Sequence, residues 1–535
     1  MPEVNPNEFP AHPLLDISEL AEVRDLRAQV PYLQPYLQPG EMVVQIDEIE
    51  RTVPDRQPSA LQAMARLAGV QRPADIGTGG PSLASISFEA NAQVAELSKF
   101  EHLFGRDSLM TALLLKDAYP QLLKTNVLAN AAVHGVRDDP VTGEQPGGIA
   151  HDNMDPADPV AQKFAHYYGW RFPMYTTVDA TPLFIDAFCT AESQDDGLLH
   201  EMYVDKTGQE RPARYALDAA VAWLERRLDD NPEGLLEYHK TQAKGMDNHA
   251  WKDSFHAYVH EDGLPANHEA GIASIEVQGY AYDALVRAAV HYAIHGHSGR
   301  ADELLMRAYQ LRQRVLHDFW VEDEHGGFFA LATDRDEHGN LRPLRVRSSN
   351  MGHLLRSKLL DGDDPAIVHK RETVIRQLFT PEMLAAGGIR TLASDEVGFN
   401  PYSYHNGGVW GHDTGWIAAG LEKHGYYGLA WELNKCNLAS VEATRSFPEL
   451  VQGGDEAEPR VSERWVSAWN PDSGLLYPLE RTPQEIQAWM VAAVLAAKYK
   501  WPLPAGFPRR TATMPLTAVD PAKRQFEESI LETLH

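Results

Sequence analysis

Apolar residues recur at helical spacing along most of the chain from about residue 86 onward. The segments RYALDAAVAWLERRL (214–228), SIEVQGYAYDALVRAAVHYAI (274–294) and EIQAWMVAAVLAAKYK (485–500) place apolar side chains three or four positions apart. This spacing is typical of a helix that buries one face. Applied to the whole chain, the pattern predicts roughly a dozen helices, and the segments that connect them are long, polar and rich in aromatic residues.

One region has a different pattern and predicts strands. GGFFALAT (326–333) and LRPLRVRSS (341–349) flank the turn-forming segment DRDEHGN, which indicates a β-hairpin. Two sites carry helix-start signals, namely Thr181 before Pro182 and the capping box that begins at Thr482 and Pro483. We therefore expect helices to begin at these two places.

The order of these elements limits the fold class. Strands do not alternate with helices, which argues against a doubly wound or TIM-barrel sheet. An α-solenoid stays open as an arrangement, although the sequence has no repeat of fixed period. A closed ring of helical hairpins with its loops gathered at one end fits better. We predict an all-α protein with a small N-terminal arm or β element (1–85), a catalytic ring (86–505) and a C-terminal extension (506–535).

Charge and cysteine content narrow the functional classes. The formal net charge is −28, from 76 acidic and 48 basic residues. Nucleic acids and anionic membrane surfaces both require a basic face, so neither is an expected partner. Cys189 and Cys436 lie in helix-like segments and are expected to be free thiols in a reducing compartment. With no secretory signal visible at the N-terminus, a cytoplasmic protein is expected. The oligomeric state stays open.

Motifs for nucleotides and metals give no positive signal, so the sequence predicts neither a cofactor nor a metal. Asp334, Asp336 and Gly339 resemble part of a calcium loop, but the twelfth position is Arg345 where such a loop has glutamate. We interpret that stretch as a hairpin turn. His295 and His297 are potential metal ligands, although cations at a helix end are the simpler interpretation.

Two acidic motifs indicate sugar chemistry. Arg106 and Asp107 lie where a helix is expected to begin, and together they offer a donor fork beside an acceptor, which suits neighbouring sugar hydroxyls. Asp253 follows Trp251 in a polar loop. A carboxyl group that is desolvated by an aromatic neighbour stays protonated near neutral pH, as a general acid must. A helix cap and a solvated loop aspartate are the alternatives.

Two further loops complete the candidate site. Residues 400–413, NPYSYHNGGVWGHD, combine aromatic rings with amides, as sugar pockets do. Glu449 in a later loop is a candidate base for activating water, with an exposed loop glutamate as the alternative. In an inverting glycosidase two carboxylates lie roughly 6.5–9.5 Å apart with water between them. Only a closed fold brings Asp253 and Glu449 together.

Taken in order, these motifs resemble a known family. The set is FGRDSL, YTTVDATPLF, WKDS, IEVQGYAYDAL, SSNMGHLL, GGIRTLAS, NPYSYHNGGVWGHD, FPEL and QAW. It is similar to the catalytic domain of bacterial amylo-α-1,6-glucosidases, the glucosidase family of debranching enzymes, and more distantly to glucoamylases. The similarity runs from about residue 95 to 500.

The resemblance implies an (α/α)6 barrel and cofactor-free, inverting hydrolysis of α-glucosides. Asp253 in WKDS would be the general acid and Glu449 in FPEL the general base, with Asp413 as the next candidate base. Arg106 and Asp107 would hold the terminal glucose. The remaining pocket residues implied by the motifs are Trp251, His405, Asn406, Trp410 and Asp413.

Departures from the family favour a small glucoside over a polymer. Debranching proteins often carry a β domain before FGRDS, whereas few strand signals precede this motif here. Other functions stay open on the same fold. They are a glycoside phosphorylase, which needs a phosphate site; an epimerase that uses His405 and His412; and a non-catalytic glycan-binding protein.

Overall fold

The computed structural model describes residues 87–88, 103–117, 119–240, 243–324, 326–461, 465–470, 475–479, 486–500 and 520–534. The expected arm at 1–85 lies outside these residues. Helices dominate the described chain, and the strands form small sheets of two or three members, so the fold is mostly helical as predicted. No helix within the described ranges is both long and apolar enough to cross a membrane.

The helices follow one another along most of the described chain. They are α4 (Gly105–Leu114), α5 (Pro120–Ala132), α6 (Pro159–Tyr167), α7 (Ala180–Glu192), α8 (Ala213–Asp229), α9 (Ile275–Ile294), α10 (Ser298–Asp318), α11 (Asn350–His353), α12 (Pro365–Leu378), α13 (Gly411–Lys423), α14 (Tyr427–Thr444), α15 (Ala488–Lys500) and α16 (Pro521–Leu534), with 3-10 turns at Leu198–His200 and Lys358–Leu360.

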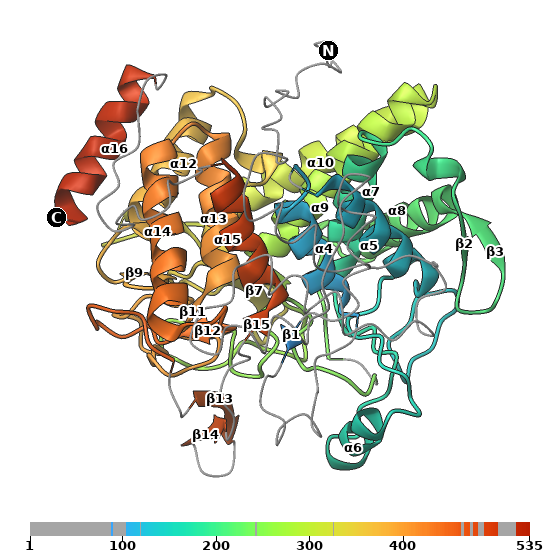
Figure 1. The fold of residues 1–535 in the computed structure, drawn as a ribbon, viewed down its shortest axis with the longest axis horizontal. Coiled ribbons are helices and arrows are strands. Elements are labelled where there is room, and N and C mark those ends of the chain that lie inside the picture. Colours follow the sequence, from blue (N-terminus) through green and yellow to red (C-terminus); the bar gives the residue numbers. More distant parts are fainter. Residues whose placement is uncertain are drawn as a thin grey trace, which may run out of the picture.

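Six of the described helices form a chain of contacts in which each one packs on the next. α4 packs on α7, α7 on α9, α9 on α11, α11 on α13 and α13 on α15. α15 in turn packs on α4, so the last of these helices contacts the first, and the two lie side by side at the centre of Figure 1. The helix that follows each of the first five packs against it on a second layer: α5 on α4, α8 on α7, α10 on α9, α12 on α11 and α14 on α13.

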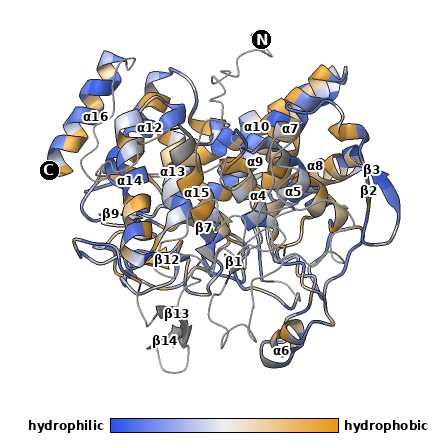
Figure 2. Cartoon of the chain, in the orientation of Figure 1, coloured by the Kyte–Doolittle hydropathy of each residue, from blue (hydrophilic) through white to orange (hydrophobic). Residues whose placement is uncertain are grey.

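Burial explains which helices take the central positions. Every residue of α7 is buried, and α9 is buried along most of its length. A helix that is apolar on all sides must be surrounded by protein. α10 instead buries a single stripe at spacings of three and four, made by Ala301, Leu304, Ala308, Leu311 and Val315. Figure 2 shows the same contrast, with hydrophilic residues along α16 and α12 at the edge of the molecule.

The strands are short and lie in the connections. They are β1 (Ser87–Phe88), β2 (Met202–Val204), β3 (Glu210–Pro212), β4 (Ala273–Ser274), β5 (Trp320–Asp323), β6 (Gly326–Phe329), β7 (Ala332–Arg335), β8 (Leu341–Pro343), β9 (Leu384–Ala385), β10 (Gly388–Ile389), β11 (Val409–Trp410), β12 (Leu450–Val451), β13 (Trp465–Asn470), β14 (Leu475–Leu479) and β15 (Ile486–Gln487). All of the pairs formed by these strands are antiparallel.

The expected hairpin forms, but it is shorter than the sequence pattern indicates. β7 pairs with β8 around a turn in which Gly339 has a φ of +82° and Asp336 accepts backbone hydrogen bonds from His338 and Asn340. This is the hairpin turn expected in place of a calcium loop. The first half of the predicted strand forms a separate strand, β6. It pairs with β5, the strand that precedes it in the sequence.

Three local predictions were wrong. Ser87 and Phe88 form a strand paired with β15, although a helix was expected from about residue 86. α7 begins at Ala180 after Asp179, and the Thr181 hydroxyl accepts from the Ile149 backbone N–H, so Thr181 is not the cap. α15 begins at Ala488, well after the capping box at Thr482. In each case tertiary contacts decide where the element starts.

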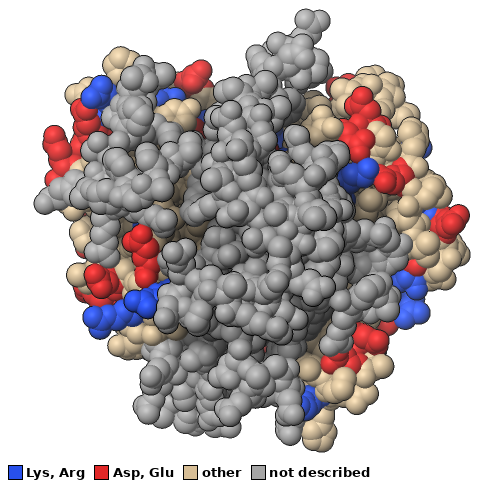
Figure 3. Space-filling view, in the orientation of Figure 1, with Lys and Arg blue, Asp and Glu red and all other residues tan. Residues whose placement is uncertain are grey.

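The last described helix, the two cysteines and the charged surface can also be compared with the sequence predictions. α16 packs on α14 at one edge of the molecule, so this part of the expected C-terminal extension contacts the helical body (Figure 1). Cys189 is buried, Cys436 is partly buried, and both are free thiols. Acidic and basic side chains are mixed on the described margins of the face in Figure 3.

Close packing between α13 and the segment after α11 gives a stability prediction. A Cβ atom on Gly420 would lie 2.6 Å from the Arg356 backbone nitrogen and 2.7 Å from the Leu355 carbonyl carbon. Backbone cannot move away as a flexible side chain can, so we expect Gly420→Ala to destabilise the protein by about 1–3 kcal/mol. The control is Gly299→Ala in α10, where the added Cβ has open space and alanine favours the helix. Thermal unfolding should show a lower Tm for the first variant only, and equal Tm values would contradict this packing.

Candidate active site

The beginnings of the central helices carry a concentration of polar side chains. Arg106 and Asp107 lie in the first turn of α4, Asp179 precedes α7, Glu276 opens α9 and Asp413 lies in the first turn of α13. All five side chains are buried. Contacts across neighbouring helices, described below, show that these beginnings lie at the same end of the helical body.

Arg106 is the centre of a buried ionic cluster. Its Nη1 donates to Asp179 Oδ2 and its Nη2 to Asp253 Oδ2, each at 3.2 Å, while Asp107 Oδ2 lies 3.6 Å from Nε. Burial opposes the guanidinium charge, but the three carboxylates outweigh that effect and raise the Arg106 pKa. One cation therefore serves three anionic groups, which leaves the carboxylates only partly neutralised.

Burial and the neighbouring charges raise the pKa of two of these carboxyl groups. Burial raises the pKa of Asp253 to about 6, with Arg106 opposing the shift and Asp179 adding to it. Burial likewise raises the pKa of Asp107 to about 7, again with Arg106 opposing it, and with Asp253 and Asp179 reinforcing it. The Asp253 side chain keeps 19% of its surface exposed, so it is the member of the cluster that remains open to solvent.

Two hydrogen bonds connect the loop of Asp253 with the loop of Glu449 through residues 404 and 405. Ser254, the next residue after Asp253, bonds through its hydroxyl to His405 Nδ1 at 2.7 Å. Tyr404, the residue before His405, donates its hydroxyl to Glu449 Oε1. β11 pairs with β12, which fixes the loop of Glu449 against the loop of Trp410. The two carboxylates that lie far apart in sequence therefore belong to directly bonded neighbouring loops.

Tryptophan and histidine rings pack between these loops. Trp251, Trp410, Trp489 and Leu450 form a buried apolar cluster with Tyr404 against it. The Trp251 and Trp410 rings meet edge to face at 5.8 Å. His412 and His405 stack on Trp489 and Trp410 with ring centroids 3.8 and 5.4 Å apart. Burial lowers the pKa of both histidines far below the usual range, so both rings are neutral at pH 7.

Several buried polar atoms here have no hydrogen-bond partner among the described residues. They are Asp107 Oδ2, Trp251 Nε1, Asn406 Oδ1, both ring nitrogens of His412, Asp413 Oδ2 and Trp489 Nε1. Buried polar groups normally find partners, and further exceptions occur elsewhere in the described chain, for example Asn126 Oδ1 and the Tyr203 hydroxyl. The atoms at this end of the helical body include both donors and acceptors.

A second polar network lies beside the aromatic cluster, where His353 stacks on Trp251, and Asp413 is the member that the sequence predicted. Asp413 Oδ1 bonds to His353 Nε2 at 2.5 Å, and Tyr280 bonds to the other nitrogen of His353 at 2.5 Å. Lys252 is fully buried and donates to the Thr391 carbonyl oxygen at 2.5 Å. Its pKa is lowered by burial, against the opposing charges of Asp413 and Glu276.

Sequence reasoning missed other residues at the end of the body where the central helices begin, because it considered each motif alone. Asp179 and Tyr404 lie inside the motifs YTTVDATPLF and NPYSYHNGGVWGHD, yet only the folded chain shows that they hold Arg106 and Glu449. All nine site residues predicted from the sequence lie at this end of the body or in loops that contact it. Asp413 is completely buried and faces His353, whereas Asp253 is partly open.

Comparison with known proteins defines the class. The family model described as "Mannosylglycerate hydrolase MGH1-like glycoside hydrolase domain" matches residues 187–457, which is more than half of the chain. The chain therefore belongs to this family of glycoside hydrolases. The matched range includes Asp253 and Glu449, while Arg106 and Asp179 precede it.

The other comparisons add little. No curated protein sequence matches the chain. A solved structure named "Sialidase" has a TM-score of 0.40 and 14% identity, over 59% of this chain. The chain spans only 25% of that protein's length, and no argument rests on this similarity. The predicted class of glycoside hydrolase is thus confirmed, whereas the amylo-α-1,6-glucosidase family stays a prediction.

Proposed function

We propose that this chain is an inverting glycoside hydrolase that removes a terminal glucose from small α-glycosides. Asp253 is the general acid and Glu449 the general base in this proposal. The observation that carries it is the pair of hydrogen bonds that joins the loops of these two carboxylates beside one aromatic cluster. Ser254, next to Asp253 in the chain, bonds to His405, and Tyr404, next to His405, bonds to Glu449.

The environment of Asp253 supports the role of acid. Protonating a glycosidic oxygen requires a carboxyl group that still holds its proton near neutral pH. Burial raises the Asp253 pKa to about 6, and the 19% exposed surface leaves the group accessible. Asp107 has a higher pKa but is more completely buried against Arg106, which suits a role in holding substrate.

The environment of Glu449 supports the role of base. The Tyr404 hydroxyl donates to one carboxylate oxygen and so fixes the orientation of the group. A fixed orientation is what a base needs to hold the attacking water in line with the bond that breaks. In the proposed reaction Asp253 gives its proton to the leaving oxygen. Glu449 takes one proton from the attacking water, and the configuration at the anomeric carbon inverts.

The remaining predicted residues are proposed to hold the sugar. The Arg106 and Asp107 pair offers donors and acceptors to adjacent hydroxyls, while Trp251 and Trp410 present apolar ring surface. Asn406 Oδ1 and Asp413 Oδ2 add buried acceptors with no hydrogen-bond partner among the described residues. We propose no cofactor or metal in the reaction, which two carboxylates complete without one.

The proposal includes the (α/α)6 barrel and the range of the catalytic domain. The support for it is that contacts run from α4 through α7, α9, α11, α13 and α15 and back to α4, with α5, α8, α10, α12 and α14 packed outside them. Residues 86–505 would form the catalytic domain. The proposed active site then lies where the central helices begin.

A second substrate class has direct support. The matching family is described by mannosylglycerate hydrolase, whose name refers to a mannoside. Mannose differs from glucose only in the configuration at C2, so the same carboxylate pair would serve either sugar. We keep α-mannosides with small aglycones, including mannosylglycerate, as the second candidate.

Product release from a panel of glycosides tests the function. The panel contains small α-glucosides, α-mannosides and glycogen, with and without phosphate, and NMR identifies the anomer released. We expect β-glucose from an α-glucoside without phosphate, and Asp253→Asn should lower turnover by about 10²–10⁴-fold. A requirement for phosphate would indicate a phosphorylase, release of mannose alone would select the second candidate, and normal turnover by Asp253→Asn would reject its role as acid.

Glu449→Gln separates binding from chemistry. The amide keeps the shape of the side chain but cannot accept a proton from water, so we expect hydrolysis to fall by about 10²–10⁴-fold while sugar affinity stays within a few-fold. Calorimetry measures the affinity. The control is Glu456→Gln, a glutamate from the same loop, which should keep full activity. Normal hydrolysis by Glu449→Gln would move the base to another carboxylate, with Asp413 considered first.

The pH profile tests the origin of the Asp253 pKa. The acid works while protonated, so kcat/KM should fall as the pH rises through about 6. The negative charge of Asp179 raises the Asp253 pKa, so Asp179→Asn should lower it and move this falling limb to lower pH. Asp262→Asn, an exposed aspartate in the loop of Asp253, is the control. An unchanged limb in Asp179→Asn would contradict the assigned coupling.

A further inference from the structure

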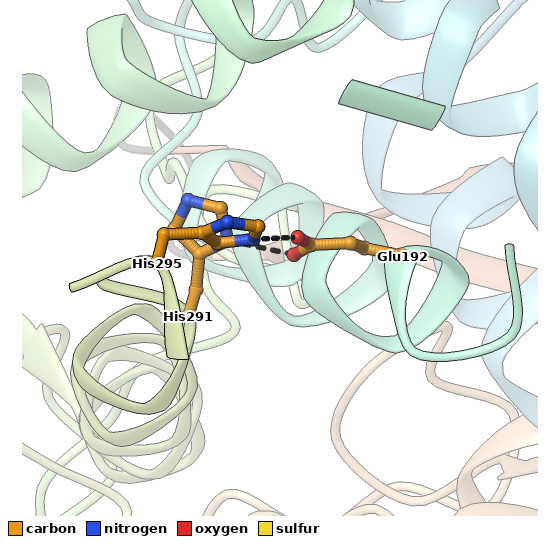
Figure 4. Close-up of side chains that lie close together, drawn as sticks. All are labelled: Glu192, His291 and His295. Carbon is orange, nitrogen blue, oxygen red and sulfur yellow. Dashed lines mark hydrogen bonds and ion pairs between the residues drawn. The ribbon is translucent and has the colours of Figure 1, made fainter. Parts of the chain in front are cut away.

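A second polar cluster lies where α7 and α9 end (Figure 4). Glu192 is the last residue of α7, and its Oε2 lies 2.6 Å from His291 Nδ1. Its Oε1 lies 2.7 Å from Nε2 of His295, the residue after α9. These three side chains each offer one ligand atom, and all three atoms lie within 4.8 Å of one another. Among the described residues this is the one such group of histidine and acidic side chains.

The cluster is separate from the proposed active site. Asp179 and Glu276 mark the beginnings of α7 and α9, whereas Glu192 and His295 mark their ends. Helices rise about 1.5 Å per residue, which places these ends roughly 20 Å and 30 Å away along the two helices. A ligand here would therefore act on the structure and would not touch the reacting sugar.

We propose that Glu192, His291 and His295 form a zinc-binding site that ties the ends of α7 and α9 together. Zn²⁺ prefers imidazole nitrogen and carboxylate oxygen in a tetrahedral arrangement, and three protein ligands leave a fourth position for water. His291 and Glu192 are buried, while the His295 side chain is 40% exposed and gives the ion a route from solvent. Oxygen-preferring cations such as Mg²⁺ do not suit a site with two imidazoles.

The electrostatic setting favours a cation. Both helices direct their C-terminal ends at the cluster, and the exposed carbonyl groups there carry partial negative charge. The Glu192 carboxylate adds its own oxygen ligands between these two ends and faces both histidines. A zinc ion would bind all three side chains at once, and its charge of +2 would replace the protons that now lie between Glu192 and the histidines.

The change in geometry needed to bind zinc is small. In the present arrangement ring nitrogens and carboxylate oxygens lie 2.6 and 2.7 Å apart. Zinc bonds of about 2.0–2.2 Å in a tetrahedron separate ligand atoms by roughly 3.3 Å. The two pairs between Glu192 and a histidine would therefore move apart by less than 1 Å, and the two histidine nitrogens, which lie within 4.8 Å of each other, would settle at the same separation. Each ring nitrogen that faces Glu192 must lose its proton, which passes to the other nitrogen of a neutral ring or to solvent from a charged one.

The sequence signal for this site was misread. The sequence indicated His295 and His297 as the two potential metal ligands. His297, however, precedes α10, and its ring lies against Tyr292. The true partner of His295 is His291, four positions earlier on the same helix face. Glu192 comes from a different helix, so only the fold shows the third ligand.

Zinc binding by the full-length, untagged chain tests the proposal. After dialysis against EDTA, the protein is titrated with ZnCl₂ by calorimetry and its Tm is measured with and without the ion. We expect one Zn²⁺ per chain, a higher Tm, and no response to MgCl₂. His295→Ala should weaken zinc binding at least about tenfold and remove the Tm shift. His297→Ala, an exposed histidine two positions away, should keep both.

Glu192→Gln is a second variant that keeps the shape of the side chain, and it should also weaken zinc binding. The proposal is overturned if the wild type shows no zinc-dependent heat or Tm shift. It is also overturned if His295→Ala and Glu192→Gln bind zinc like the wild type. Neither readout involves a sugar, so the outcome is independent of the proposed function. Glycoside turnover of the zinc-depleted protein should equal that of the zinc-bound protein.

Discussion

The balance of charge around Arg106 is the constraint on which the proposed site depends. A buried guanidinium needs partners, and a buried carboxylate that lacks one is costly. Arg106 holds Asp179 and Asp253 directly and lies close to Asp107. Three carboxylates share this one cation, and burial raises the pKa of Asp253 to about 6 and that of Asp107 to about 7. The same contact joins α4, the start of α7 and the loop before α9, so it links the chemistry of the site to the assembly of the helices.

The arrangement of the helices supports this charge cluster. The central helices bring their N-terminal ends to one side, and the partial positive charge of those ends favours acidic groups. Acidic residues indeed lie in the first turns of α4, α9 and α13. The connections before these helices then deliver aromatic and polar side chains over the same end. The opposite ends of α7 and α9 have the opposite polarity, which is where Glu192 collects two histidines.

Sequence reasoning recovered the helical class, the β7–β8 hairpin and the motifs that meet in the site. Periodicity is a local property, so it located helices such as α8 and α9 well. It failed at Ser87, and the helix-start signals failed at Thr181 and Thr482, because strand pairing and tertiary hydrogen bonds set the element boundaries there. The motifs marked Arg106, Asp253 and Glu449 by residue type. Their partners Asp179, Tyr404 and Ser254 carry no separate signal, since a side chain that holds another one is recognised only from the folded contact.

The contact of α15 with α4 also constrains how the protein is made. α4 leaves the ribosome well before its neighbour α15 and before Trp489, which stacks on His412, because most of the described helices lie between them in the sequence. Contacts between such distant segments form late and slowly. A chain that terminates before α15 lacks both the contact with α4 and the stack of Trp489 on His412. Synthesis of α15 thus becomes a condition for assembling the proposed active site.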